Sequence, residues 1–125
     1  MITVFTIPTR NYNARSFTTS SQRLGNHLDI ANFWFLLLRY EIFSIDPGVT
    51  LTVNYEVRNS SGQLLGGSSG VVTTTGKGEF GVSRGDLNND ATFIFNVTIS
   101  GRINLGGTVY VTQKGEAIPV WRSIT

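Results

Sequence analysis

The residues that could do chemistry are few and scattered along the chain. Asp86, Asn88 and Asp90 stand at alternate positions, as the first oxygen ligands of a calcium-binding loop do. The match ends there, because the sixth loop position is Ala91 where glycine is needed and the twelfth is Val97 where a bidentate glutamate is needed. We therefore interpret this segment as a turn rich in Asp and Asn, and we predict no metal site.

A nucleophilic or acid–base site is not indicated either. His27 is the only histidine, and Asp29 two residues later would share its face of a strand. A triad also needs a nucleophile beside the histidine, and no serine stands in an elbow motif. The eight carboxylates show no pairing suited to general acid–base work. The absence of cysteine excludes disulfides and thiolate chemistry. We predict no catalytic residues and no cofactor, hence a protein that is not an enzyme.

The composition indicates which elements must carry any function. Ser, Thr, Asn and Gly make up 50 of the 125 residues, and only 14% of the chain is charged, against roughly 25% in an average domain. Helix surfaces need Glu and Lys, but the chain has four Glu and two Lys. The 40% apolar content is enough for one core. These values favour one all-β domain over an all-α fold.

Alternating apolar residues over 51–57 and 93–99 predict half-buried strands. Asp46-Pro47-Gly48 and the serine- and glycine-rich 59–62 predict turns. Strands of this length with regular turn signals predict a single antiparallel β-sandwich, immunoglobulin-like or jelly-roll, of eight to ten strands. We further expect a flexible loop at 66–70, hairpin turns at Gly76-Lys77-Gly78 and Gly106-Gly107, and a polar loop at 84–90.

The N-terminal segment differs from the rest in its charge. It carries Arg10, Arg15 and Arg23, while the first carboxylate of the chain is Asp29. Residues 2–7 alternate as a short edge strand would, and Pro8 is expected to end it.

Two interpretations of residues 8–26 stay open. They form a surface loop with one weak strand near 14–20, or an extended arm that becomes ordered on a partner. We divide the chain into an extended N-terminal strand or arm over 1–27 and a β-sandwich domain over 28–125. Deletion of residues 1–26 is then expected to abolish assembly and leave a folded domain.

The most apolar stretch is 28–43, with six consecutive apolar residues at 33–38. The aromatic residues Phe33, Trp34 and Phe35 favour a strand, with a helical turn packed on a sheet as the alternative. A strand that is apolar on both faces is covered on both faces. We expect the second face to meet another subunit or the N-terminal arm.

Several partner classes are disfavoured. A net charge of +2 is too small to indicate nucleic-acid binding. The six-residue apolar run is far below the ~20 residues of a membrane-spanning helix. The N-terminus shows neither a basic region nor a long apolar region of a secretory signal. We therefore expect synthesis in the cytoplasm and contact with neither nucleic acid nor membrane.

Two stretches carry a resemblance to a known group of proteins. They are LTVNYEVRNSSG at 51–62 and VTISGRINLGGTVYV at 97–111. Over residues 50–112 the chain resembles small immunoglobulin-like β-sandwich virion proteins of tailed bacteriophages. The resemblance implies a capsid decoration (cement) protein or a tail or fibre module, located in the virion after synthesis in the host cytoplasm. That group has no catalytic motif, so no functional residue is carried over from it.

The sequence thus leads to one functional hypothesis and one alternative. We expect a structural protein that assembles with major capsid or tail subunits, with itself, or with both. Arg10, Arg15 and Arg23 would pair with carboxylates of a partner, while Phe33, Trp34 and Phe35 would be buried against it. The alternative is a glycan-binding module of a host-recognition fibre. Its aromatic platform would consist of Trp34, Tyr55, Tyr110 and Trp121.

Overall fold

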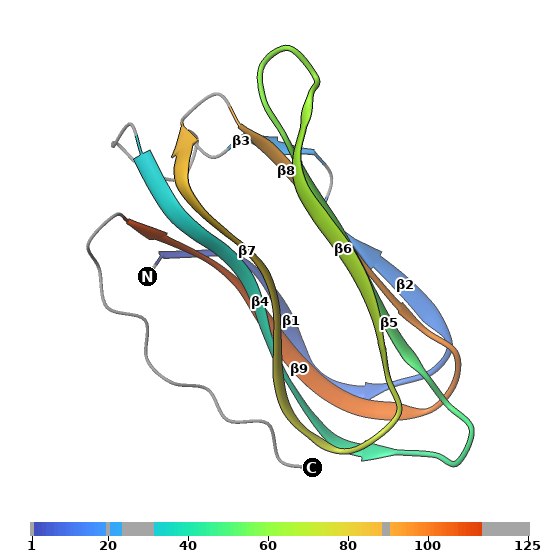
Figure 1. Ribbon diagram of the computed structural model, residues 1–125. Helices are drawn as coiled ribbons and strands as arrows, with labels where there is room; N and C mark the ends of the chain where they lie inside the picture. The colour runs from blue at the N-terminus through green and yellow to red at the C-terminus, as the bar shows by residue number, and fades with distance from the viewer. Residues whose placement is uncertain (1, 20, 24–31, 89–90, 114–125) are drawn as a thin grey trace.

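The computed structural model of the protein describes residues 2–19, 21–23, 32–88 and 91–113, with 32–35, 82–88 and 113 described by their backbone alone. The predicted fold class is confirmed, since the described chain is all-β and forms two antiparallel sheets packed as a sandwich (Figure 1). The strands are β1 (Ile2–Tyr12), β2 (Arg15–Thr18), β3 (Gln22–Arg23), β4 (Asn32–Ile45), β5 (Leu51–Arg58), β6 (Leu64–Val72), β7 (Gly76–Asn88), β8 (Thr92–Ile99) and β9 (Ile103–Gln113).

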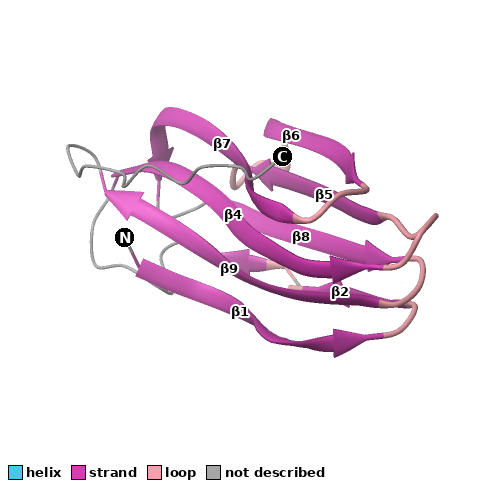
Figure 2. Cartoon of the chain, turned by 90° about the horizontal axis from the view of Figure 1, so that it is seen from below, coloured by secondary structure: helices cyan, strands magenta, loops and turns pink. Residues whose placement is uncertain are grey.

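Each sheet has two edge strands. Sheet A has the strand order β1-β9-β4-β7, and sheet B has the order β2-β8-β5-β6, with β3 also paired to β8. Consecutive strands such as β5 and β6 form hairpins, whereas the pairings of β1 with β9 and of β2 with β8 join distant parts of the chain. Figure 2 shows β6 at one margin of the molecule and β1 at the opposite margin.

The core lies between the sheets and follows the predicted alternation. In β5 and β8 every second side chain is buried, and the residues between them face outward. Burying each large apolar side chain contributes roughly 1.5–3 kcal/mol, so these rows fix how the sheets face each other. The buried residues of the four central strands are Leu36, Leu38, Tyr40, Ile42, Leu51, Val53, Tyr55, Val57, Phe93, Phe95, Val97, Ile99, Ile103, Leu105, Val109 and Val111.

The N-terminal strand is an edge strand, as expected, but it is longer than expected. β1 pairs with β9 from Ile2 to Tyr12, and Pro8 does not end it. The pairing instead shifts register between Ile7 and Arg10. An edge strand accommodates a proline because the missing N–H is not needed by a second neighbour.

The expected division at residue 27 has no counterpart in the described pairing. β1 is part of sheet A and β2 is part of sheet B, and Ile7 and Tyr12 belong to the common core. A polar segment without acids can form such strands because an edge strand buries few of its side chains. Residues 2–12 and 15–18 therefore complete the sandwich and do not lie across its face.

The strand interpretation of the apolar stretch is correct. Leu36 and Leu38 of β4 point into the core, while Leu37 and Arg39 face away from it. Both outward side chains are only 5% exposed, so both faces are covered here within a single chain. None of the described strands of the N-terminal segment is the cover, because β1 lies at the edge of the same sheet and β2 and β3 belong to sheet B.

Four predicted loops or turns are strand instead, three of them inside a strand and the fourth, Gly76-Lys77-Gly78, at the start of β7. Residues 66–70 lie inside β6, 84–88 inside β7 and Gly106-Gly107 inside β9. Glycine is required at Gly106 because a Cβ atom there would lie 2.1 Å from Thr9 Oγ1 of the irregular edge strand β1. The predicted turns at 46–48 and 59–62 are correct, with positive φ at Gly48 and Gly62. Gly76, expected in a turn, begins β7 with a φ of 130°.

Candidate interaction edge

Arg15, the first predicted partner residue on sheet B, contacts two rings of its own chain. Its guanidinium carbon lies 4.1 Å from the ring centroid of Phe17 and 5.6 Å from that of Tyr12. These two rings meet edge to face at 5.1 Å. Arg15 therefore covers the aromatic pair that joins β2 to β1, a stacking role for which a planar guanidinium is suited.

Arg10 and Arg23 lie elsewhere. Arg10 is an exposed residue of the edge strand β1. Arg23 lies beside Arg58 in a depression formed with Asn59 and Ser60. Arg15 and Arg23 pair with Ile99 and Thr92 of β8, which places them about 23 Å apart along that strand. The structure does not bring the three arginines into one site.

The predicted aromatic contact residues lie at the start of β4. The backbone of Phe33 pairs with Leu87 of β7 and Gln113 of β9, and that of Phe35 pairs with Ser83 and Thr112. Both ladders shift register between Phe33 and Phe35, so Trp34 stands at an irregular point of the strand. The side chains of Phe33, Trp34 and Phe35 lie outside the described part of the structure, and their role stays a prediction.

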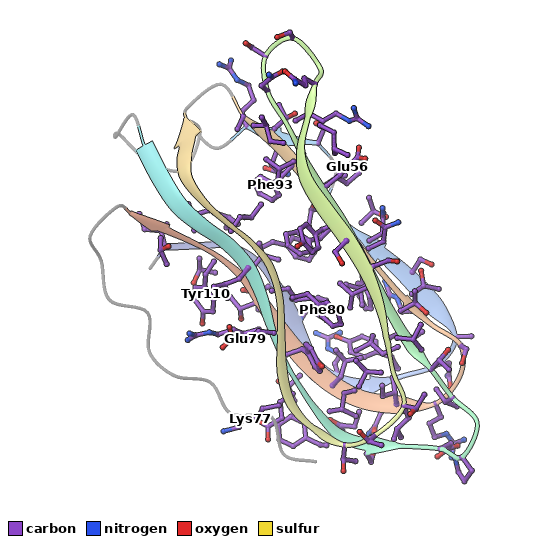
Figure 3. All side chains as sticks on the ribbon, in the orientation of Figure 1. Glu56, Lys77, Glu79, Phe80, Phe93 and Tyr110 are labelled. Atoms are coloured by element: carbon purple, nitrogen blue, oxygen red, sulfur yellow. The ribbon has the colours of Figure 1, made fainter. Side chains whose placement is uncertain are left out.

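An ion pair occupies the outer face of sheet A. Arg39 Nε lies 3.5 Å from Glu79 Oε1, and the two side chains are 6% and 33% exposed. The guanidinium carbon of Arg39 is also 5.8 Å from the ring centroid of Tyr110. Figure 3 shows Glu79 and Tyr110 on the side of sheet A away from β5 and β6, whereas Phe80 points between the sheets. The ion pair therefore lies at a covered surface, because the Arg39 side chain is almost fully buried.

A shallow depression of about 210 Å³ lies next to this ion pair. Gly106 and Gly107 contribute no side chain to it, and Phe43, 53% exposed, lies at its border. Its charged members are Arg39 and Glu41. Within the described residues no group of three or more His, Asp or Glu side chains comes together. Of the sequence candidates, His27, Asp29, Asp90 and Trp121 lie outside the described residues.

Two tyrosines of the predicted core have shifted ionisation. Burial raises the pKa of Tyr55 and also that of Tyr40 above the usual tyrosine value. The Tyr55 hydroxyl donates to the carbonyl oxygen of Gly81, which links β5 of sheet B to β7 of sheet A. Its ring stacks on Phe95 at 5.1 Å. With 6% of its surface exposed, Tyr55 cannot form part of an exposed aromatic platform for a glycan.

Three of the four sheet edges carry protection against pairing with another chain. β1 has two register shifts, Pro8 and Arg10, and β2 has four residues and begins with an arginine. β7 carries Lys77 and Glu79, with Arg84 and Asp86 further along its sequence. Bulges, proline, charges and shortness are the usual means by which natural edge strands avoid adding a neighbour.

The edge strand β6 has none of these protections apart from one register shift between Leu64 and Gly66. It runs for nine residues, and the sequence from 59 to 76 contains neither a charged residue nor a proline. Its pairing with β5 is regular from Gly66–Val57 to Val72–Leu51. Leu64 and Val71 are 54% and 62% exposed and are two of the three exposed large apolar residues in the described chain.

The position of β6 is fixed from the inside. A Cβ atom on Gly70 would lie 2.3 Å from the Phe80 ring of β7, so glycine lets that ring pack against the strand. A Cβ atom on Gly67 would likewise lie 2.8 Å from the carbonyl oxygen of Tyr55. β6 is therefore an ordered strand that is paired, among the described residues, with β5 alone. Sequence reasoning missed its centre, 66–70, because glycine and serine give no alternation of buried and exposed side chains.

No family model, curated protein or solved structure matches the chain. In the described residues there is no helix of the length and apolarity needed to cross a membrane.

Proposed function

We propose that the chain is a non-enzymatic structural subunit that assembles with protein neighbours into a larger particle. The particle is a phage virion, in which the chain serves as a capsid decoration or cement protein or as a tail component. The observation that supports assembly is the uncharged edge of β6, where Leu64 and Val71 are exposed. The sequence resemblance over residues 50–112 suggests the virion.

Strand addition is the mechanism that this edge favours. An edge strand presents one row of N–H and C=O groups that no neighbouring strand of its own sheet uses. A strand from a neighbour can pair with that row, so that main-chain hydrogen bonds supply affinity and side-chain contacts supply specificity. The rest of the sandwich serves as a rigid frame that holds β6 in an extended conformation, which lowers the entropy lost on binding.

The other predicted partner residues have separate places in this proposal. Arg10 is an exposed residue of β1, the strand that Figure 2 shows at the margin opposite β6, and is available to a carboxylate of a different neighbour. Arg15 contributes mainly to its own chain, because its guanidinium stacks on Phe17. Phe33, Trp34 and Phe35 remain proposed contact residues.

The proposal is tested by fractionating the culture that produces the protein on a density gradient. We expect the chain to sediment with particles far heavier than its own 13.7 kDa and to stay with them after a second gradient. Recovery of the chain only in the light soluble fractions would contradict the proposed function.

A further inference from the structure

The nine residues of β6 are nearly symmetric about their midpoint. Read from either end, the strand begins with two large aliphatic residues, Leu64-Leu65 at one end and Val72-Val71 at the other. A glycine follows on each side, Gly66 and Gly70, and the centre is Gly67-Ser68-Ser69. A strand of this pattern presents the same order of side chains to an antiparallel copy of itself.

From this symmetry we infer that β6 pairs with β6 of a second copy, antiparallel and about a two-fold axis at Ser68. This inference rests on the proposed function and names one partner for the same edge. The regular part of the strand places Gly66 opposite Gly70 and Gly67 opposite Ser69 of the other copy, while the leucine end beyond the register shift lies at the same end as Val71 and Val72 of the other copy. Ser68 then stands opposite its own counterpart, as an isologous two-fold interface requires.

The charges and exposures of the strand favour a second copy over a different partner. With no charged residue between 59 and 76, the edge offers nothing to select an oppositely charged partner and nothing to repel an identical one. Leu64 and Val71 are more than half exposed in the single chain. In the two-fold arrangement each aliphatic end meets an aliphatic end, so the apolar surface on both copies is removed from water.

The paired arrangement extends sheet B across the axis. Its strand order becomes β2-β8-β5-β6 in one copy, followed by β6-β5-β8-β2 in the other. Only the β6 edge permits this for sheet B, because β2 at the other end has four residues and starts with Arg15. The proposed pair therefore has one edge (β6), one orientation (antiparallel) and one register (centred on Ser68).

Cysteine cross-linking tests the register directly, because the natural chain has no cysteine. Ser68→Cys places two sulfur atoms at the proposed axis, where directly opposite Cα atoms lie about 4.5–5.5 Å apart, within the reach of a disulfide. Ser69→Cys moves the sulfur one residue away, to a diagonal separation of about 7–8 Å. Ser16→Cys on β2 is a matched control, since Ser16 is also an exposed strand serine of sheet B at its opposite edge.

We expect mild oxidation to convert Ser68→Cys to a covalent dimer about tenfold faster than either of the other two variants, because only its sulfur atoms meet bonding geometry. Equal rates for Ser68→Cys and Ser69→Cys would indicate a parallel or random encounter and would overturn the inference. Equal and slow rates for all three variants would overturn it as well. Thermal unfolding of each reduced variant checks that the sandwich is intact.

The cross-linking experiment and the density gradient test different claims, so their outcomes are independent. If the chain sediments with particles but Ser68→Cys gains no advantage, the proposed function stands and the two-fold pairing is wrong. If Ser68→Cys cross-links as expected but the chain never sediments with particles, the pairing stands and the proposed function is wrong.

Discussion

At the scale of single residues, the sandwich contains polar side chains that are buried and paired. Tyr55 joins the two sheets through its hydroxyl, and Arg39 pairs with Glu79 on a covered sheet face. Neither arrangement was visible in the sequence, where Tyr55 was a candidate for a glycan platform and Arg39 one of several arginines. Their partners come from β7, which neighbours neither residue in sequence. Such contacts depend on strand pairing and therefore need the fold.

Alkaline conditions test the burial of Tyr55. Burial raises its pKa above the usual value, which is about 10, so the folded state disfavours the phenolate. The stabilising contribution is complete below about pH 10 and is lost as pH rises from there toward the raised pKa. We expect the free energy of unfolding, measured in urea, to fall above about pH 10 and to fall less in Tyr55→Phe.

Tyr55→Phe also removes the hydrogen bond to the Gly81 carbonyl. At neutral pH this should cost about 0.5–1.5 kcal/mol, the net contribution of one ordinary hydrogen bond, because Gly81 is exposed and its carbonyl can turn to water. The chain has four tyrosines, so the signal of Tyr55 is the difference in tyrosinate absorbance between the natural chain and Tyr55→Phe. A difference that appears at an ordinary tyrosine pKa while both proteins are still folded would show that Tyr55 is not buried as described.

Loss of the Glu79 carboxylate should destabilise the protein measurably. Glu79→Gln removes the carboxylate charge that lies 3.5 Å from the buried guanidinium of Arg39. Because Glu79 is one-third exposed, we expect a cost of about 1–3 kcal/mol, below the 3–5 kcal/mol of a fully buried pair. Chemical denaturation gives the free energy of unfolding.

Glu56→Gln is the matched control for this change. The pair of Glu56 with Arg58 has both side chains 43% exposed, so its loss should cost less than about 1 kcal/mol. Equally small losses of unfolding free energy in the two variants would mean that the Arg39 side chain is not buried as the structure describes.

At the scale of elements, the sequence predicted the strands that alternate and the apolar strand β4, and it missed the glycine- and serine-rich centre of β6. β5 and β8 are correct because their side chains alternate between core and solvent. The centre of β6, at 66–70, carries only Gly and Ser and was expected to be a loop. Its conformation is determined by pairing with β5, which is a tertiary contact. The candidate edge could not be predicted because strand order decides which strands lack a second neighbour, although the symmetry of 64–72 is readable in the sequence.

Gly70→Ala tests whether 66–70 is an ordered strand. The added methyl group would meet the Phe80 ring at 2.3 Å, and such overpacking costs about 1–3 kcal/mol. A flexible loop would instead be neutral to alanine or stabilised by about 0.4–1 kcal/mol. We expect thermal unfolding at a lower temperature for Gly70→Ala and little change for the exposed neighbour Ser69→Ala.

The cost of Gly70→Ala should shrink when Phe80 is first replaced by alanine, because the clash partner is then gone. The same cost in both backgrounds would place Phe80 away from Gly70.

Deletion of residues 1–26 has a different expected result from the one that the sequence alone suggested. The deletion removes an edge strand from each sheet, together with Ile7 and Tyr12 of the core. Loss of two large buried side chains costs several kcal/mol by truncation data, about 2–5 kcal/mol for each site, which approaches the 5–15 kcal/mol stability of a whole domain. We expect the truncated chain to lose cooperative thermal unfolding by circular dichroism. A sharp transition close to that of the intact chain would restore the division at residue 27.

At the scale of the whole molecule, β6 is the one described sheet edge that is long and uncharged, and we propose that it pairs with a second copy. Its net charge of +2 puts little electrostatic repulsion between copies. The protected edges β1, β2 and β7 limit strand pairing to β6, so association by this route ends at a pair and does not continue as an open fibre. The proposed pair would present two equivalent β1 margins, which is what the proposed assembly with other neighbours requires.

The mass of the chain in solution tests this account most directly. Val71→Lys places a charge on the outer face of β6, where the side chain is 62% exposed, so folding should be unaffected while pairing is opposed. Ser16→Lys makes the equivalent change on β2. In sedimentation velocity over a range of concentrations, we expect the natural chain and Ser16→Lys to reach twice the 13.7 kDa monomer mass, and Val71→Lys to stay monomeric. A natural chain that remains monomeric at every concentration, or a Val71→Lys variant that pairs as tightly as the natural chain, would contradict the account.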